Sequence, residues 1–352
     1  MKEFIFKNVT KFKNLNLIKH FGIILLITIF SEGCVLLRLP AVLNSRITSE
    51  VYLKINDQVM KISPGEKDGL FVTPNINPQG NEVIFHGALS GYSRIWKYSV
   101  NQKSVEALTD SSYIAVEPCF SWDGSLIAFV SDKGLEQKRE DMKDISTNIF
   151  KMATMYLGGN PKILNLYVMN SDGSNLRQLT NWNAVDMRPT FSPDGKHVLF
   201  MSTFKSGTIK KRNLYKISIN GDGEPQLVPN SEGANRPSYS ADGKWIYFWK
   251  EIDKRGTLCK MLSDSKEWYP LKFDKGGIGS HGAFIDPTGE WLWFHSVQDK
   301  DNPINQIYKI PVDGSEIISI TPIGFEREHV AHVTASLNGN FAFDVLKVLK
   351  KK

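Results

Sequence analysis

One four-residue turn recurs six times along this chain, and each copy is followed by a short apolar strand. The clearest copy is SPDG at Ser192–Gly195, which precedes the strand His197–Met201. Its residues suit a type I turn, because Ser favours the first position, Pro fixes φ at the second and Gly tolerates the last. The other copies are NPQG at Asn77–Gly80, SWDG at Ser121–Gly124, SADG at Ser240–Gly243, DPTG at Asp286–Gly289 and SLNG at Ser336–Gly339.

The spacing of these turns indicates the architecture. Their glycines are 44, 71, 48, 46 and 50 residues apart. A second strand, which usually opens on an aliphatic–aromatic pair, repeats in phase with them. Its copies begin at Val51, Ile95, Leu166, Leu214, Leu258 and Ile307. A period of this size built from short strands is typical of β-propeller blades and not of a helical solenoid.

The two repeated elements are offset at the ends of the chain. The first copy of the second strand, at Val51, has no turn before it, and the last turn, at Gly339, has no second strand after it. If Val51–Ile62 completes the blade that His332–Val345 begins, both counts close at six and no sheet edge stays exposed. The sequence therefore predicts an all-β fold, a six-bladed β-propeller whose N- and C-terminal strands share the closing blade.

Three of the repeated segments resemble the repeats of the TolB-like (WD-type) β-propeller family. They are FSPDGKHVLFMS from Phe191, SWDGSLIAFVS from Ser121 and LYVMNSDGSNLRQLT from Leu166. The resemblance extends over roughly residues 51–345, and its period makes it specific for the fold. It is much less specific for function, because propellers carry many different activities.

The N-terminal segment, residues 1–38, is expected to be a signal peptide or a membrane anchor. Five lysines precede the apolar run Phe21–Phe30, whose ten residues suit a signal-peptide core better than a bilayer span. The following SEGC partly resembles a lipoprotein processing site, so lipidation of Cys34 stays open beside ordinary cleavage or an uncleaved anchor. The rest of the chain divides into a linker at 39–50, the propeller at 51–346 and a basic tail at 347–352.

The net charge of +6 is located mainly at the two ends of the chain. Residues 1–38 carry +4 and the four tail lysines carry another +4, which leaves the propeller near −2. A nearly neutral body argues against nucleic-acid binding, which needs a basic face. The two cysteines beyond Cys34, Cys119 and Cys259, fall in blades that do not touch, so no disulfide is expected between them.

The second blade is longer than the others, and its excess lies between its second and third strands. Within it, Met142, Ile145, Ile149, Met152 and Tyr156 recur at three- and four-residue spacing. This pattern predicts an amphipathic helix in an insertion at about 132–163. Two interpretations stay open: a helix that packs on the ring, and a helix that binds a partner.

Aligning the repeats on their turn glycines identifies the residue that opens each innermost strand. These residues are Thr73, Glu117, Arg188, Arg236, Gly282 and His332. The preceding loops add Asp186, Asn235, His281, Glu328 and His329.

In a propeller these positions should surround the mouth of the central channel, where loops converge. The predicted binding site at this mouth comprises Glu117, Asp186, Arg188, Asn235, Arg236, His281, His329 and His332. The alternative interpretation is a channel lined by polar groups because water fills it. Under both interpretations the charges border water and contribute little to stability.

A weaker alternative is a metal site formed by His281, His295, His329 and His332. Imidazoles near one axis suit Mn, Zn or Fe, and this set resembles that of propeller lyases acting on oligogalacturonate. The chain has no tight His-x-His or His-Glu-x-x-His spacing. It also lacks a G-x-S-x-G motif and the length for an attached hydrolase domain.

The leading hypothesis is a non-enzymatic protein of the cell envelope, exported to the periplasm or anchored in the membrane, which needs no cofactor. It would bind a protein or peptide partner through its channel mouth. The alternative hypothesis is a metal-dependent propeller enzyme that acts on an oligosaccharide.

Overall fold

The computed structural model is built from β-strands throughout the part of the chain that it describes. The described residues are 24–29, 33–38, 45–65, 69–89, 92–135, 163–206, 211–253, 255–271, 279–297 and 304–350. None of them lies in an α-helix, and so none of these segments is a long apolar helix able to cross a membrane. Most of the predicted helical insertion, residues 136–162, lies outside the described residues.

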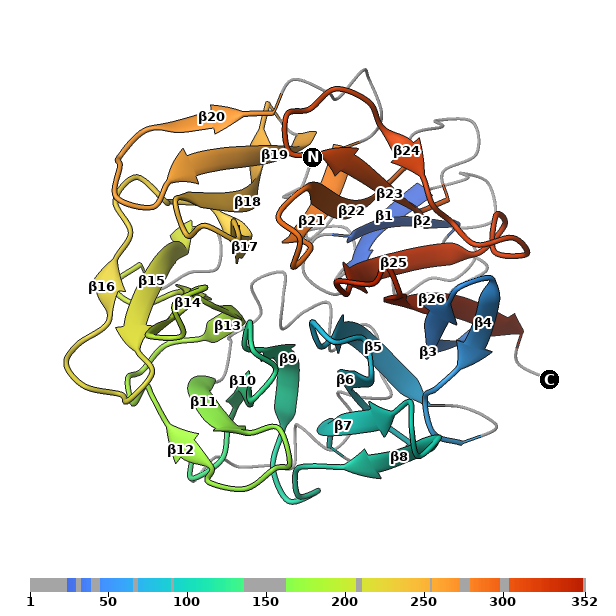
Figure 1. The fold of residues 1–352 in the computed structure, drawn as a ribbon, viewed down its shortest axis with the longest axis horizontal. Coiled ribbons are helices and arrows are strands. Elements are labelled where there is room, and N and C mark those ends of the chain that lie inside the picture. The colour runs from blue at the N-terminus through green and yellow to red at the C-terminus, as the bar shows by residue number, and fades with distance from the viewer. Residues whose placement is uncertain are drawn as a thin grey trace, which may run out of the picture.

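The strands form antiparallel sheets arranged as a ring around a central axis (Figure 1). The innermost strands are β5 (Leu70–Ile76), β9 (Ala115–Phe120), β13 (Asp186–Phe191), β17 (Asn235–Tyr239), β21 (Gly279–Ile285) and β25 (His329–Ala335). The second strands are β6 (Glu82–Ala88), β10 (Leu126–Ser131), β14 (His197–Ser202), β18 (Trp245–Ile252), β22 (Trp291–Val297) and β26 (Phe341–Lys350). The fold is therefore an all-β propeller, as the sequence predicts.

Two further strands extend each sheet outward. The third strands are β7 (Arg94–Ser99), β11 (Asn165–Asn170), β15 (Asn213–Ser218), β19 (Arg255–Leu262), β23 (Gln306–Pro311) and β3 (Ser45–Ile55). The short fourth strands, at the periphery in Figure 1, are β8 (Ser104–Ala107), β12 (Arg177–Gln178), β16 (Gln226–Leu227), β20 (Trp268–Pro270), β24 (Ile318–Ser319) and β4 (Gln58–Lys61).

The repeated turns join the first and second strands as the sequence predicts. Gly195 has φ of +68° and donates from its backbone N–H to Ser192 O at 3.0 Å. The Ser192 hydroxyl donates to Asp194 Oδ1 at 2.5 Å, and the same oxygen accepts from Lys196 N at 3.0 Å. The turn glycines of the other five copies also have positive φ. The six turns lie on one side of the ring, here called the turn face.

The first and last strands of the ring pair with each other. β3 runs antiparallel to β26, with Val51 opposite Asp344, and β4 pairs with β3. Leu53 and Phe343 from the two strands are fully buried. The predicted pairing of Val51–Ile62 with His332–Val345 is therefore present.

Two strands precede the ring. β1 (Ile24–Ile29) and β2 (Gly33–Arg38) form an antiparallel hairpin in which Thr28 lies opposite Cys34. The apolar run predicted as a signal-peptide core overlaps β1. Cleavage, anchoring and lipidation at Cys34 stay predictions.

A phenylalanine occupies the same position in every second strand and forms the centre of each sheet. These residues are Phe85, Phe129, Phe200, Phe248, Phe294 and Phe343, all of them among the largest fully buried side chains. Because each sheet packs against its neighbours on both faces, an apolar ring at this position is buried from two sides. In three of the sheets the residue that follows this phenylalanine accepts a hydrogen bond in the site described next; these residues are His86, His295 and Asp344.

Candidate binding site in the central channel

Each innermost strand is interrupted at the same height by a shift in register against its partner. The residue at the shift has a left-handed backbone, with φ between +48° and +65° in all six strands. These six residues are Thr73, Glu117, Arg188, Arg236, Gly282 and His332. They are the six residues that the sequence alignment identifies, but each lies within its innermost strand and does not open it as predicted. A left-handed φ costs a non-glycine residue about 1–3 kcal/mol, so five of the six positions are strained.

The register shift separates the N–H of the left-handed residue from its own sheet, and the preceding sheet supplies an acceptor in three cases. Glu117 N donates to His86 Nδ1 at 3.1 Å, and Thr73 N donates to Asp344 Oδ1 at 3.3 Å. His332 N donates to His295 Nδ1 at 3.4 Å. The three acceptors follow the buried phenylalanine of their second strands. They therefore have a structural role, because a buried N–H needs a partner.

In two other sheets the N–H of the left-handed residue has a different kind of acceptor. The residues equivalent to His86 on β10 and β14 are Val130 and Met201, which offer no comparable acceptor. Arg188 N donates instead to Glu117 Oε2 at 2.7 Å. Arg236 N donates to Asn235 Oδ1 at 2.8 Å. Glu117 and Asn235 thus also stabilise the channel backbone.

A second tier of such contacts is formed by the N–H groups three residues further along the strands. Phe120 N donates to Asn75 Oδ1 at 2.8 Å, and Ile76 N donates to Thr334 Oγ1 at 3.0 Å. Ile285 N likewise donates to Ser238 Oγ at 3.2 Å. Neighbouring sheets are thereby connected by hydrogen bonds at two heights of the channel.

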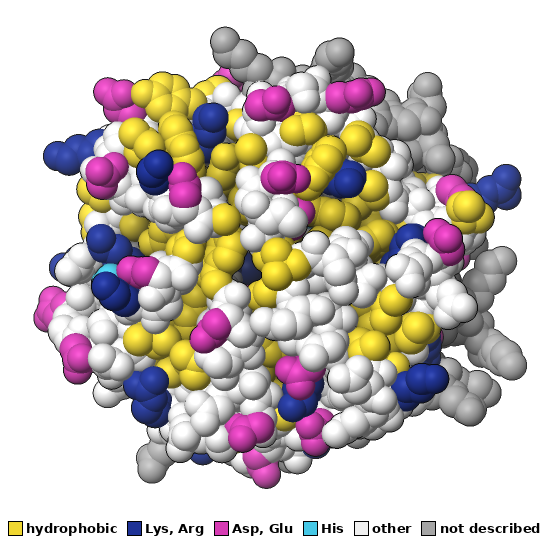
Figure 2. Space-filling view, in the orientation of Figure 1, with side chains coloured by type: hydrophobic (Ala, Val, Ile, Leu, Met, Phe, Trp, Pro, Cys, Tyr) yellow, Lys and Arg dark blue, Asp and Glu magenta, His cyan; other side chains and the backbone are white. Residues whose placement is uncertain are grey.

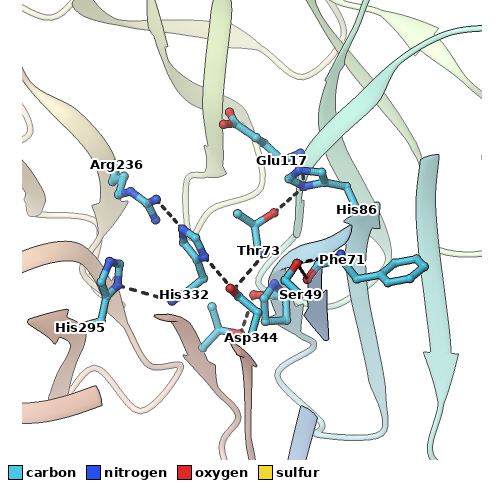
Figure 3. A network of polar contacts seen from close by, with 11 residues as sticks. Ser49, Phe71, Thr73, His86, Glu117, Arg236, His295, His332 and Asp344 are labelled. Carbon is cyan, nitrogen blue, oxygen red and sulfur yellow. Dashed lines mark hydrogen bonds and ion pairs between the residues drawn. The ribbon is translucent and has the colours of Figure 1, made fainter. Parts of the chain in front are cut away.

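Arg236, His332 and Asp344 form a continuous polar chain across the channel (Figure 3). Arg236 Nη2 lies 2.7 Å from His332 Nε2, and His332 Nδ1 lies 2.7 Å from Asp344 Oδ1. Because a guanidinium can only donate, His332 Nε2 is the acceptor and Nδ1 carries the proton. Burial and the charges of Arg236 and Arg188 lower the pKa of His332 well below its usual value. Burial raises the pKa of Asp344 to about 7.

His86 has the opposite tautomer. Its Nδ1 accepts from the backbone of Glu117 and lies 2.5 Å from the Thr73 hydroxyl, which donates to it. Since Nδ1 accepts a backbone N–H, the neutral ring carries its proton on Nε2. Burial, Arg188 and His332 lower the pKa of His86 well below its usual value, so the ring stays neutral.

Arg188 and Glu117 form the second polar group of the channel. Arg188 Nε lies 3.1 Å from Glu117 Oε1, and the two side chains are 8% and 2% exposed. The charges expected beside open water are therefore largely buried. A buried ion pair carries a large desolvation cost, so the loss of one partner has a much greater effect here than at the surface.

These residues line a cavity of about 150 Å³ on the axis of the ring. All six left-handed residues contribute to its wall, and so do His295 and the turn residues Pro78, Trp122 and Pro287. The cavity therefore reaches the turn face, where the innermost strands end. Among the residues that the structure describes, its lysine and arginine lining consists of Arg188 and Arg236. Figure 2 shows dark blue atoms in a central depression surrounded by hydrophobic side chains.

The structure brings Glu117, Arg188, Arg236 and His332 together in the cavity wall, but three other predicted site residues are absent from that wall. Asp186 is fully buried and accepts from Thr180 Oγ1 at 2.5 Å, from Ser202 Oγ at 2.6 Å and from the Trp182 indole at 2.9 Å. Burial raises its pKa to about 7. Asn235 is occupied by the backbone of Arg236, and His329 Nδ1 accepts from Asn305 N at 3.4 Å.

The structure also places the histidines of the metal hypothesis. The rings of His295 and His332 are 5.3 Å apart, whereas His329 lies outside the cavity wall. The backbone of His281 lies on β21 opposite His295, and its side chain is outside the described residues. Among the side chains that the structure describes, no group of three His, Cys, Asp or Glu is placed to hold a metal ion.

Sequence reasoning from the innermost strands misses His86 and Asp344, which lie on second strands. A signal for both was available. Each of them directly follows the buried phenylalanine of a strand that is covered on both faces. A polar side chain at such a position needs a hydrogen-bond partner, and the polar groups of the central channel can supply it.

Comparison with known proteins supports a resemblance to TolB. No family model matches the chain. A protein TolB homolog of Chlorobium chlorochromatii (strain CaD3) is 27% identical over 150 residues, which are 38% of this chain and 33% of that protein. A second homolog, from Chlorobium luteolum, is 26% identical over 141 residues, 35% of this chain and 32% of that protein. The matches thus cover about a third of the length of these curated relatives.

Solved structures agree with the fold. A putative TolB from Agrobacterium tumefaciens has a TM-score of 0.61 at 18% identity, covering 86% of this chain and 99% of that one. TolB from Acinetobacter baumannii has a TM-score of 0.52 at 14% identity, covering 86% of this chain and 65% of that one.

Proposed function

Because this chain resembles the TolB-like β-propellers in sequence and in fold, we propose that it is an exported cell-envelope propeller that binds a protein or peptide partner through its central channel. The partial matches to TolB homologs support the location and the kind of partner. The proposed compartment is the periplasm, with membrane attachment through the N-terminus as its variant.

The propeller has six blades in this proposal, and the shared sheet of β25, β26, β3 and β4 closes the ring. Six first strands carry the same register shift, and six second strands carry the same buried phenylalanine. The pairing of β3 with β26 supports closure. A closed ring presents a stable rim on which a partner can dock.

The observation that carries the binding proposal is the composition of the cavity. Its lining combines the guanidinium groups of Arg188 and Arg236 with the turn residues Pro78, Trp122 and Pro287. The second residue of every repeated turn is apolar, and Leu337 at that position in the last turn is 57% exposed. A partner segment with an apolar body and one acidic group would fit this arrangement, since guanidinium groups pair strongly with carboxylates.

The partner hypothesis is tested by crosslinked capture from cell envelopes with residues 45–352 carrying Leu337→Asp. This change puts a charge on the apolar rim, which is the set of second residues of the repeated turns, because Leu337 N donates to the O of the lining residue Pro78 at 3.0 Å. It does not enter the core, since Leu337 is exposed. Ile323→Asp is the matched control, since Ile323 is 95% exposed and belongs to none of the repeated turns. Loss of a captured partner with Leu337→Asp alone supports the rim. Equal capture by both variants and the unchanged protein would overturn it.

Export is tested separately. A reporter fused after residue 50 should reach the cell envelope, and replacing three residues of the apolar run Phe21–Phe30 by Asp should retain it in the cytoplasm. Cys34→Ser distinguishes lipidation, because only a lipoprotein would lose its membrane attachment. A cytoplasmic reporter with the unchanged N-terminus would refute export.

A further inference from the structure

The side of the ring opposite the turn face, here called the loop face, presents an unusually exposed apolar side chain. The innermost strands begin on this side, and the connection from β24 to β25 crosses it. Ile323 lies in this connection and is 95% exposed. That is the largest exposed fraction of any large apolar side chain that the structure describes. Leu89, at the loop-face end of β6, is 43% exposed.

The loop that carries Ile323 is fixed to the closing sheet of the ring. Phe325 packs edge-on against Tyr52 and Phe343, with ring centroids 5.1 Å and 5.4 Å away. Phe325 N also donates to Pro322 O at 3.1 Å. The loop therefore places Phe325 on the sheet while Ile323 stays in solvent. Because the loop is already ordered, docking of Ile323 on an apolar phase costs little further conformational entropy.

Basic residues lie beside this loop. Lys347 Nζ, at the loop-face end of β26, lies 3.2 Å from the hydroxyl of Tyr52, on whose ring Phe325 packs. Lys347 and Lys61 share the single carboxylate of Glu50, so the three groups together carry one positive charge. An exposed apolar side chain and excess positive charge thus occur together on the loop face.

The two ends of the ring lie at the same place. Ser45, the first residue of β3, is opposite Lys350, the last residue of β26. Two more lysines follow Lys350 in the sequence, and residues 39–44 separate Arg38 from Ser45. Seven residue steps span at most about 25 Å. A membrane attachment within residues 1–38 would therefore bring the loop face close to the bilayer.

We propose that the loop face docks on a lipid bilayer with anionic headgroups. Ile323 inserts at the boundary between headgroups and acyl chains, and the lysines at the end of β26 lie among the headgroups. Stable attachment to a membrane commonly combines an apolar anchor with basic residues. The inference rests on the membrane-attached form of the proposed function and adds which face meets the bilayer. The turn face and its cavity then point away from the membrane, toward a partner.

A fluorophore at position 323 tests the docking directly. The full chain with Ile323→Cys, labelled with an environment-sensitive dye, is added to phosphatidylcholine vesicles with and without phosphatidylglycerol. Leu337→Cys is the matched control, since Leu337 is also exposed, at 57%, but lies on the turn face. The unchanged protein, treated with the same dye, gives the signal of the native cysteines. We expect brighter and blue-shifted emission from position 323 with phosphatidylglycerol, and no response from position 337.

Cosedimentation with the same vesicles measures the affinity. Ile323→Asp should weaken binding about tenfold, because it removes an apolar contact and adds a charge of the same sign as the headgroups. Ile323→Trp should tighten binding, since indole rings favour the membrane interface. Leu337→Asp should leave the affinity unchanged. Added salt should weaken binding of every form, because it screens the lysines.

The opposite results are equally clear. No response at position 323, or equal responses at positions 323 and 337, would overturn the proposal and leave a protein as the occupant of the loop face. Equal binding to vesicles with and without phosphatidylglycerol would overturn the role of the lysines. The proposed function fails or stands separately, because partner capture from envelopes dissolved in detergent involves no bilayer. In that experiment Ile323→Asp remains a control for the turn face.

Discussion

Arg236 donates from Nη2 to His332 Nε2 at 2.7 Å, although a whole strand, β21, lies between the strands that carry these two residues. The contact is possible because β21 has Gly282 at this height. A Cβ placed on Gly282 would lie 3.1 Å from Arg236 Nη1 and 3.3 Å from His295 Cε1. The missing side chain thus leaves space for the guanidinium to cross the channel.

Gly282→Ala should lower the free energy of unfolding by about 2–3 kcal/mol. The alanine must adopt the left-handed φ of +65°, and it also crowds Arg236. Gly314→Ala is the matched control, because Gly314 has φ of +80° with no atom near its added Cβ. It should cost about 1 kcal/mol. Denaturant unfolding measures both, and equal costs would show that Arg236 moves aside without penalty.

Arg188→Glu should destabilise the fold by about 3–5 kcal/mol, because it places a second carboxylate beside buried Glu117. The same change at Lys244, which pairs with Asp242 at 3.6 Å on the surface, should cost less than about 1 kcal/mol. Urea unfolding curves compare the two variants. Similar small effects would mean that the channel pair is solvated, as the sequence alone suggests.

Stability should fall as the pH rises from about 4 to 7. Asp186 has a folded-state pKa of about 7 against an ordinary value of 3.8, so its protonated form is favoured by folding. Its contribution is complete below 3.8 and is lost as the pH rises through 7, with a slope of at most about 1.4 kcal/mol per pH unit. Asp344 adds a similar slope.

The measurement is the free energy of unfolding at several pH values for the unchanged protein and for Asp186→Asn. The amide cannot titrate, so this variant should show a shallower pH dependence. An identical slope in both proteins would mean that Asp186 is ionised in the fold throughout this range.

Removing residues 1–62 should give an aggregating protein, because β26 would lose its partner β3 and expose a long sheet edge. Fully buried Phe343 and Val345 would then lie at the uncovered end of the sheet. Removing only residues 1–44 leaves β3 intact and should give a soluble, cooperatively melting protein. Size-exclusion chromatography distinguishes the two products, and a soluble shorter form would contradict closure by β3.

The sequence predicts the backbone of this propeller well because its turns determine their own geometry. Alignment on Gly80 and its five equivalents picks out the left-handed residue of each innermost strand, although it places that residue at the strand's first position and not inside the strand. The offset of the repeats indicates the pairing of β3 with β26. Both depend on local turn chemistry and on the regular period of the repeats. These can be read from the sequence without knowing which residues are in contact.

The environment of the channel residues could not be predicted in the same way. Asp186 and Arg188 are two positions apart, yet the first is enclosed by Thr180, Trp182 and Ser202 while the second lines the cavity. Which of two neighbouring polar residues faces the axis depends on the register shift and on partners from other strands. Neither is visible in the spacing of the repeats.

The pairing of β3 with β26 also means that the chain could begin and end at another place in the ring. Ser45 lies opposite Lys350, so the two ends of the described propeller are adjacent in space. A short linker could join them, and the chain could be opened in a loop between two other sheets, since exposed loops tolerate new termini. The blades could therefore be synthesised from a different first blade and still take the same places around the axis. A circular permutant should form the same channel.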